Sequence, residues 1–256
     1  MRSNPANGRA SAAWTLALSL LALPVDASQL NLRWNACWGD GGIRNRDFAC
    51  DTDSGAELLV VSFAPPFAMT GVTGMEVKVR LAFAGTSIPA WWQLSAITGN
   101  CRATSLVTQF TPPQGSIACR DWAGGFASGL TSYSPGTFGN NFAVILAISQ
   151  VPTAGAANLV AEQEYFVCGF VIDYAATAGP GACGGCTLGA CLGASGIEIT
   201  QANGTTTALI PTSIDDQQVT WQGAAGVGIP SSGPLFCPGV TAARRSTWGS
   251  VKAIYH

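Results

Sequence analysis

The amino-acid sequence predicts an all-β protein: an antiparallel β-sandwich, of the jelly-roll or immunoglobulin-like kind, with disulfide-stapled loops. Three observations lead to this prediction. Short apolar or alternating segments recur between glycine- and proline-rich turns, without a long helical period. Nine cysteines stand mostly in or beside those turns. Only 10% of the residues are charged and 48% are hydrophobic, a composition that excludes disorder driven by charge.

The beginning of the chain has the pattern of a secretory signal peptide. Arg2 and Arg9 precede an apolar stretch over residues 14–23, which is far shorter than the ~20 residues of a membrane-spanning helix. We expect residues 1–27 to be cleaved, which leaves one domain over 28–240 and a tail over 241–256. The mature chain should then have no transmembrane segment and be secreted, extracellular or on the cell surface, with the periplasm as a further option.

Glu164–Tyr174 is apolar on both faces and predicts a central strand that is covered on both sides. Gly74–Phe83 alternates apolar and charged residues, which predicts a strand with one face on the core and one in water. Further strands are expected from shorter patterns over residues 28–34, 57–63, 91–94, 105–110, 141–148, 197–200 and 219–221.

Two segments fit no strand pattern. Residues 111–140 show no clear period, and a helical turn is expected at 121–130 although Gly124 and Gly125 weaken it. The end of the chain, residues 246–256, carries Trp248 and other large apolar residues at helical spacing, which predicts a short C-terminal helix. We expect that helix to dock on the protein's own sandwich, the alternative being a partner at the cell surface.

Export makes disulfides the expected state of the cysteines, and their odd number leaves at least one without a partner in the chain. Cys168 is the predicted free thiol, because it stands in the middle of an apolar strand between two phenylalanines. Local bridges are expected for the pairs Cys37–Cys50 and Cys101–Cys119. Two further bridges of open connectivity are expected among Cys183, Cys186, Cys191 and Cys237.

The sequence offers little of the usual catalytic apparatus. It has one histidine, His256, so histidine-based nucleophile systems and zinc sites lack their key residue. Two carboxylates alone can hydrolyse a glycoside, but nothing in the spacing predicts which acids face each other. The acids considered for this role are Asp121, Glu162, Glu164 and Glu198.

Metal sites are not expected, and no cofactor is expected either. Cys183, Cys186, Cys191 and Cys237 could form a zinc site with four thiolates, but disulfides are the better interpretation in an exported protein. Residues 51–55, DTDSG, have the beginning of a calcium loop without its closing glutamate. The formal net charge of −2 gives no basic surface for a nucleic acid.

Trp91 and Trp92 are the predicted binding residues. Neighbouring residues of a strand point to opposite faces, so the functional interpretation is that one of the two indoles faces outward and stacks on a sugar ring. The interpretation that the residue type favours is that both belong to the core, as large aromatic residues usually do.

Two resemblances add to these patterns. The strand succession, carried by GMEVKVRLAF, NFAVILAIS, EYFVCGFVIDY and SGIEIT, resembles the sandwiches of cohesins and carbohydrate-binding modules. The segments LNLRWNAC, GACGGCTLGAC and STWGSVKAIYH resemble uncharacterised secreted bacterial proteins with a TWGxxKxxY-like tail. The second resemblance brings no activity with it. Taken with the missing catalytic residues, the patterns favour a non-enzymatic extracellular binding or structural module, with a polysaccharide or a cell-surface protein as its partner. A secreted glycoside hydrolase with two carboxylates and a cell-surface or filament subunit are the alternatives.

Overall fold

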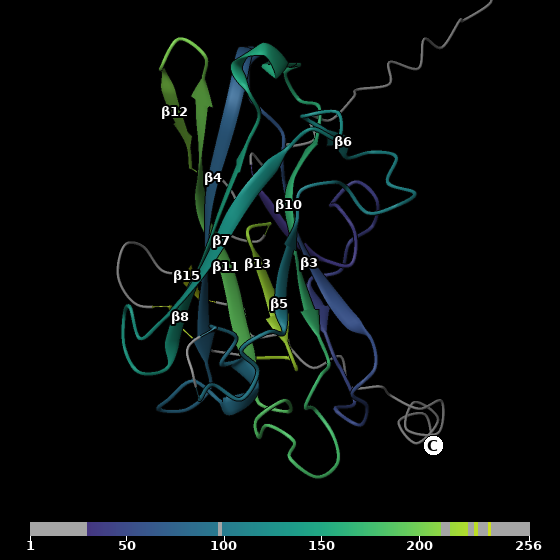
Figure 1. Cartoon of the computed structure of the whole chain (residues 1–256), viewed down its shortest axis with the longest axis vertical. Helices are drawn as coiled ribbons and strands as arrows, with labels where there is room; N and C mark the ends of the chain where they lie inside the picture. Colours follow the sequence, from purple (N-terminus) through teal and green to yellow (C-terminus); the bar gives the residue numbers. More distant parts are fainter. Residues whose placement is uncertain (1–29, 97–98, 211–215, 225–227, 230–234, 237–256) are drawn as a thin grey trace, which may run out of the picture.

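The computed structural model describes residues 30–96, 99–210, 216–224, 228–229 and 235–236 and confirms an all-β sandwich of two facing sheets (Figure 1). The expected signal peptide and C-terminal helix lie outside these residues. In the part of the chain that is described, no helix is long and apolar enough to cross a membrane.

Sheet A contains the predicted central strand. Its order is β1 (Asn31–Trp34), β3 (Ala56–Phe63), β10 (Tyr165–Asp173) and β5 (Leu106–Gln109), all antiparallel, and the short β6 (Arg120–Asp121) pairs in parallel with the start of β10. β10 therefore lies between two neighbours. It is buried along most of its length, as its apolar pattern predicted.

Sheet B is the larger layer. Its order is β2 (Asn45–Arg46), β13 (Gln218–Trp221), β11 (Ala190–Gln201), β4 (Met69–Phe83), β8 (Phe142–Gln150) and β7 (Ser128–Pro135). β12 (Thr206–Leu209) extends the sheet beside β11, and β9 (Ala157–Leu159) does so beside β4. A separate two-stranded ladder joins β14 (Gly228–Ile229) to β15 (Leu235–Phe236).

The alternation of β4 is confirmed. Met75, Val77, Val79 and Leu81 are buried, whereas Glu76 and Lys78 lie on the outward face. The inward residues of both sheets form one hydrophobic core. Burial of this apolar surface is the main favourable contribution to folding.

Residues 91–94, expected as a strand, begin instead in the 3₁₀-helix η1 (Ala90–Trp92), which starts after Pro89. A strand would send Trp91 and Trp92 to opposite faces, whereas a helical turn lets both indoles enter the core. A second 3₁₀-helix, η2 (Thr153–Gly155), follows β8.

The helical turn expected at residues 121–130 is not formed. Gly124 and Gly125 have φ values of +60° and +88°, which break a right-handed helix. The chain turns there and enters β7, a strand of mostly exposed polar residues that showed no apolar pattern. Gly129 of β7 must be a glycine, because an added Cβ would lie 2.0 Å from the carbonyl oxygen of Ile148.

Candidate functional site

Trp91 and Trp92 are both fully buried. Their rings meet edge to face, with centroids 5.0 Å apart. The prediction of an exposed indole for sugar stacking is therefore wrong at these two positions, and both side chains are core residues. A binding site in this region has to be made by the residues around them.

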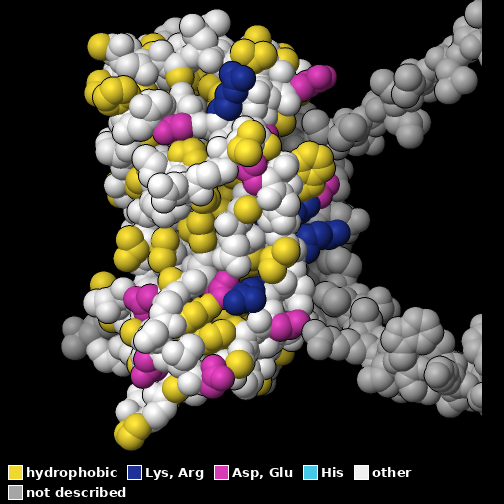
Figure 2. Space-filling model, turned by 90° about the vertical axis from the view of Figure 1, so that its right-hand side faces the viewer, with side chains coloured by type: hydrophobic (Ala, Val, Ile, Leu, Met, Phe, Trp, Pro, Cys, Tyr) yellow, Lys and Arg dark blue, Asp and Glu magenta, His cyan; other side chains and the backbone are white. Residues whose placement is uncertain are grey.

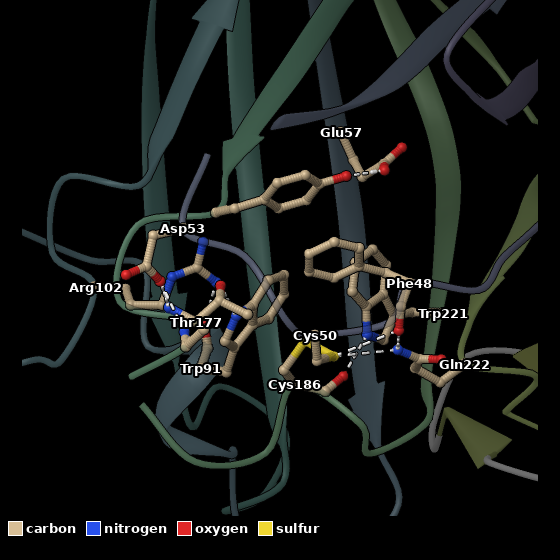
Figure 3. The surroundings of a disulfide bond; sticks show 12 residues. Phe48, Cys50, Asp53, Glu57, Trp91, Arg102, Thr177, Cys186, Trp221 and Gln222 are labelled. Carbon is tan, nitrogen blue, oxygen red and sulfur yellow. Dashed lines mark hydrogen bonds between the residues drawn. A yellow bond between two sulfur atoms is a disulfide. The ribbon is translucent and has the colours of Figure 1, made fainter. Parts of the chain in front are cut away.

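Trp91 is the centre of a network that joins the loops at this end of the sandwich (Figure 3). Its ring stacks on Trp221 with centroids 5.0 Å apart, and its Nε1 donates to Thr177 Oγ1 at 2.8 Å. The guanidinium carbon of Arg102 lies 3.8 Å from the centroid of the Trp91 ring. Burial lowers the pKa of Arg102 to about 10, so the side chain keeps its charge at neutral pH. The loops are thus fixed to a rigid aromatic floor.

Two of the three described disulfides, Cys50–Cys186 and Cys101–Cys183, staple the same region, and none of the three is an expected local pair. The pairs Cys37–Cys50 and Cys101–Cys119 are wrong, because the bridges are Cys37–Cys119, Cys50–Cys186 and Cys101–Cys183. β5 lies between residues 101 and 119 and carries the chain from one end of β10 to the other, which separates these two cysteines. In the same way, β2 pairs with β13 between residues 37 and 50.

The expectation of two bridges among Cys183, Cys186, Cys191 and Cys237 is also wrong, because Cys183 pairs with Cys101 and Cys186 with Cys50. Cys191 is disulfide-bonded and lies within β11, whereas a loop had been expected there. Cys168 has no disulfide partner and is fully buried, and burial raises the pKa of its thiol well above the ordinary value. Cys237 lies outside the described residues.

A cleft of about 330 Å³, which we call the amide cleft, begins directly after the tryptophan pair. It is formed by the segment around η1, the end of β7 and the turn into β8. None of these described lining residues carries a charge. They are Ser87, Ile88, Gln93, Asn100, Tyr133, Pro135, Gly136 and Asn140.

Several polar groups of the amide cleft are available to a ligand. Within the described residues, the side-chain amides of Gln93 and Asn140 make no hydrogen bond. Asn100 Nδ2 donates to the carbonyl oxygen of Ser95 at 3.2 Å, which leaves Asn100 Oδ1 as an acceptor. An amide side chain both donates and accepts, so the cleft can bind groups of both kinds.

Tyr133 connects the cleft to the floor beneath it. Its hydroxyl donates to the carbonyl oxygen of Trp92 at 2.5 Å, so the phenol ring is held in place. Burial raises the pKa of Tyr133, and the side chain stays neutral over the whole physiological range. The cleft is therefore a preformed, uncharged, amide-rich surface.

The acids considered for hydrolysis do not come together. Glu164 is almost buried and accepts the backbone N–H groups of Trp38 and Gly39 at 3.0 and 2.9 Å. Asp121 accepts N–H groups of its own turn, and Glu198 lies on the other sheet. Glu162 precedes β10 in the left-handed backbone region, with a φ of +62°. Glu164 and Asp121 thus have structural roles.

Sequence reasoning missed one acidic pair. Glu198 of β11 lies directly opposite Glu76 of β4 on the outward face of sheet B. Lys78 Nζ is 2.7 Å from a Glu76 oxygen, and this hydrogen bond raises the pKa of Lys78. Two shallow grooves of about 260 and 350 Å³ share the pair. Each glutamate stands between two apolar residues, which predicts that it points outward from its strand. The sequence does not reveal that these two strands pair.

The metal sites weighed from the sequence are already occupied by other interactions. Cys183 and Cys186 are in disulfides, which removes them as zinc ligands. Asp53 Oδ1 accepts the N–H groups of Thr177 and Ala178, both at 2.7 Å. One cluster of donor atoms in the described residues joins Glu164 to the Cys37–Cys119 pair, and both of its sulfurs are disulfide-bonded.

An apolar row crosses the outward face of sheet A. Val171 of β10 lies between Leu58 of β3 and Val107 of β5 in the register, and Val107 is 58% exposed. Figure 2 views the side of the molecule that carries β3 and β10 and shows hydrophobic side chains gathered in its middle, between scattered charged ones. Exposed apolar patches of this kind often mark interaction surfaces.

Comparison with known proteins adds one structural likeness. No protein-family model matches the chain, and no curated protein matches it. Among solved structures, the chain is similar to a cohesin module of the family 33 glycoside hydrolase from Clostridium perfringens ATCC13124. The two are 7% identical with a TM-score of 0.36, and the match covers 76% of this chain and 96% of that chain. A likeness at this level assigns neither a ligand nor an activity to the protein.

Proposed function

We propose that the protein is a non-enzymatic binding module and that it binds a neutral saccharide in the amide cleft. The observation that carries this proposal is the set of uncharged amide groups, led by Gln93 and Asn140, that face a cleft and make no hydrogen bond within the described residues. A concave site with a few unpaired polar groups on a rigid base is the usual form of a small-ligand site.

The chemistry of the lining favours a sugar over an ionic ligand. Sugar hydroxyls donate and accept hydrogen bonds, and so do the side chains of Gln93 and Asn140. Ile88 and Pro135 supply apolar surface for the C–H faces of a sugar ring. A charged ligand would find no opposite charge among the described lining residues and would lose its hydration without compensation.

The rigidity of the cleft supports the same proposal. Cys101 is bridged to Cys183, Asn100 stands directly before Cys101, and the Tyr133 hydroxyl donates to the carbonyl oxygen of Trp92. Side chains that are already ordered lose less conformational entropy on binding. Disulfides also support an oxidising compartment outside the cytoplasm, in agreement with the signal peptide that the sequence predicts.

The test is the retention of the protein on a panel of neutral polysaccharides, followed by titration calorimetry with the oligosaccharide that binds. Gln93→Ala and Asn140→Ala should each weaken binding about tenfold, the value of one or two hydrogen bonds. Gln114→Ala is the matched control, because Gln114 is exposed and lies outside the cleft. Unchanged binding in both cleft variants, or no retention on any neutral glycan, would refute the proposal.

A second candidate, a glycoside hydrolase, is favoured by the opposed Glu76 and Glu198. Directly opposite residues of antiparallel strands have Cβ atoms ~5 Å apart, which suits two cooperating carboxylates. Hydrolysis of aryl glycosides that is lost in both Glu76→Gln and Glu198→Gln would establish this function. If the protein is retained on glycans but hydrolyses none of them, the hydrolase is refuted and the binding module is supported.

A further inference from the structure

β7 is the outermost strand of sheet B along its main path, and it pairs with β8 alone. Its eight residues keep one register with β8 from Ser128 to Pro135 without a bulge. Most of these residues are exposed, and Leu130 is 58% exposed. Figure 1 shows β7 running along the front of the molecule, beside β5 of the other sheet.

The free edge of β7 carries unpaired backbone groups. The N–H of Gly136 donates to the carbonyl oxygen of Phe142, so these two residues form a hydrogen-bonded pair of the ladder. In the same register, the even-numbered residues of β7 form the other hydrogen-bonded pairs with β8. Because such pairs alternate along an antiparallel ladder, Gly129, Thr131 and Tyr133 turn their N–H and C=O groups away from β8. No backbone partner for these groups occurs in the described residues.

The inner side of β7 is fixed to sheet A. Thr131 Oγ1 and Thr108 Oγ1 are 2.6 Å apart, and the ring of Phe110 lies under Gly129. These contacts come from side chains, so they hold the strand without pairing its backbone edge. β7 is therefore held in place by its side chains, while the backbone groups on its free edge can still pair with another strand.

Features that usually protect an edge strand are missing from β7. Natural edge strands avoid association by charges, bulges, prolines or short length. β7 has no charged residue and no bulge, and its proline is at the last position. β5, the edge strand of sheet A beside it, has only four residues.

We propose that two copies of the protein associate through antiparallel pairing of β7 with β7, around a two-fold axis at Thr131. Gly129 then pairs with Tyr133 of the second copy, and Thr131 pairs with its own equivalent. Each of these pairs exchanges both backbone hydrogen bonds. The strand is complementary to itself, because its edge donors and acceptors are symmetric about Thr131, and an uncharged strand brings no like charges opposite each other.

The same register explains the exposed leucine. Leu130 of one copy lies opposite Ser132 of the other, and the two Leu130 side chains are diagonal neighbours across the axis. Pairing would cover both. The two-fold arrangement closes on itself, so the product is a dimer and not a fibre. This inference does not depend on the ligand of the amide cleft.

Sedimentation velocity over a dilution series of the mature protein tests the proposal. The wild type should form a particle of twice the chain mass. Ser132→Lys and Leu130→Lys each place like charges diagonally across the axis, at exposed side chains. Both should lose the dimer and keep the near-ultraviolet circular dichroism of the fold. Gln114→Lys, an exposed site outside β7, should leave the dimer unchanged.

Amide hydrogen exchange places the interface independently. The N–H groups of Gly129, Thr131 and Tyr133 should exchange slowly in the wild type and at least tenfold faster in Ser132→Lys, because the open edge is then exposed to water. A wild-type monomer at every concentration, or a dimer that survives both variants with unprotected edge amides, would overturn the proposal.

Discussion

The guanidinium group of Arg102 lies over the indole of Trp91 and also donates to the backbone carbonyl of the same residue, at 2.7 Å. The other guanidinium nitrogens donate to the carbonyl oxygens of Ala175, at 3.0 Å, and Asp173. One buried side chain thus joins its own loop to η1 and to the segment at the end of β10. Asp173 is too exposed and too far away to be a strong ion-pair partner, with 3.8 Å between the charged atoms.

Replacing this side chain should therefore destabilise the protein strongly. Arg102→Met leaves three carbonyl groups without their donor, and we expect a loss of ~3–5 kcal/mol in the free energy of unfolding by urea. Arg102→Lys should cost less, because it keeps a donor and the charge but cannot reach all three carbonyls. The matched control is Arg120→Met at an exposed position, which should change stability by less than ~0.5 kcal/mol. Equal losses at both positions would contradict the role of Arg102.

Disulfide mapping should return the long-range bridges. Peptides from the unreduced protein should contain the pairs Cys37–Cys119, Cys50–Cys186 and Cys101–Cys183. Cys168 should react with iodoacetamide only after unfolding, because it is fully buried and its raised pKa keeps it a thiol. Recovery of a Cys37–Cys50 or Cys101–Cys119 peptide would contradict the structure.

These bridges show where sequence reasoning stops. Strand patterns are local, so β3, β4, β8 and β10 could be predicted from their own residues. Disulfide partners depend on how β2 and β5 place the loops, and that is a property of strand pairing. The bridges close separations of 82 and 136 residues, which no local rule selects.

The amide cleft could likewise be predicted only in part from local sequence patterns. Its position next to Trp91 and Trp92 could be suspected from the sequence, since a proline and two tryptophans mark an unusual segment. Its other wall comes from β7 and the turn after it. β7 has no apolar period because its inward positions are Gly129, Thr131 and Tyr133 instead of aliphatic residues. A polar edge strand and a polar loop have the same composition, and only the register with β8 distinguishes them.

A pH dependence should arise from Asp40. Burial alone would raise the pKa of Asp40, but hydrogen bonds from the N–H groups of Ala118 and Ile117 and from the hydroxyl of Ser116 outweigh it and lower the pKa. A lowered pKa means that the folded state favours the carboxylate. The stabilisation is complete above the ordinary pKa of 3.8 and disappears as the pH falls through the lower, folded value.

Urea unfolding at a series of pH values measures this effect. The stability difference between wild type and Asp40→Asn should be constant at neutral pH and should shrink below about pH 4. Asp47→Asn, at an exposed carboxylate that accepts one bond from Asn45, is the control. A difference that is independent of pH down to acid unfolding would show that the charge of Asp40 does not stabilise the loop.

The two tryptophans give a final, paired prediction. Both are fully buried, so Trp91→Ala and Trp92→Ala should each cost ~3–5 kcal/mol of stability. Substitution by phenylalanine, which removes the indole N–H, should distinguish the two positions. Trp91 Nε1 donates to Thr177, whereas Trp92 Nε1 is buried and has no partner in the described residues.

Trp91→Phe should therefore be more costly than Trp92→Phe by about 1 kcal/mol, because it removes a hydrogen bond and leaves the Thr177 hydroxyl without its donor. Equilibrium unfolding followed by circular dichroism measures both, and Trp38→Phe, at a partly exposed indole, serves as the reference. If Trp92→Ala kept its stability and lost polysaccharide retention instead, that indole would be a binding residue and its burial in the core would be refuted. Equal costs for the two phenylalanine variants would remove the role of the Thr177 bond.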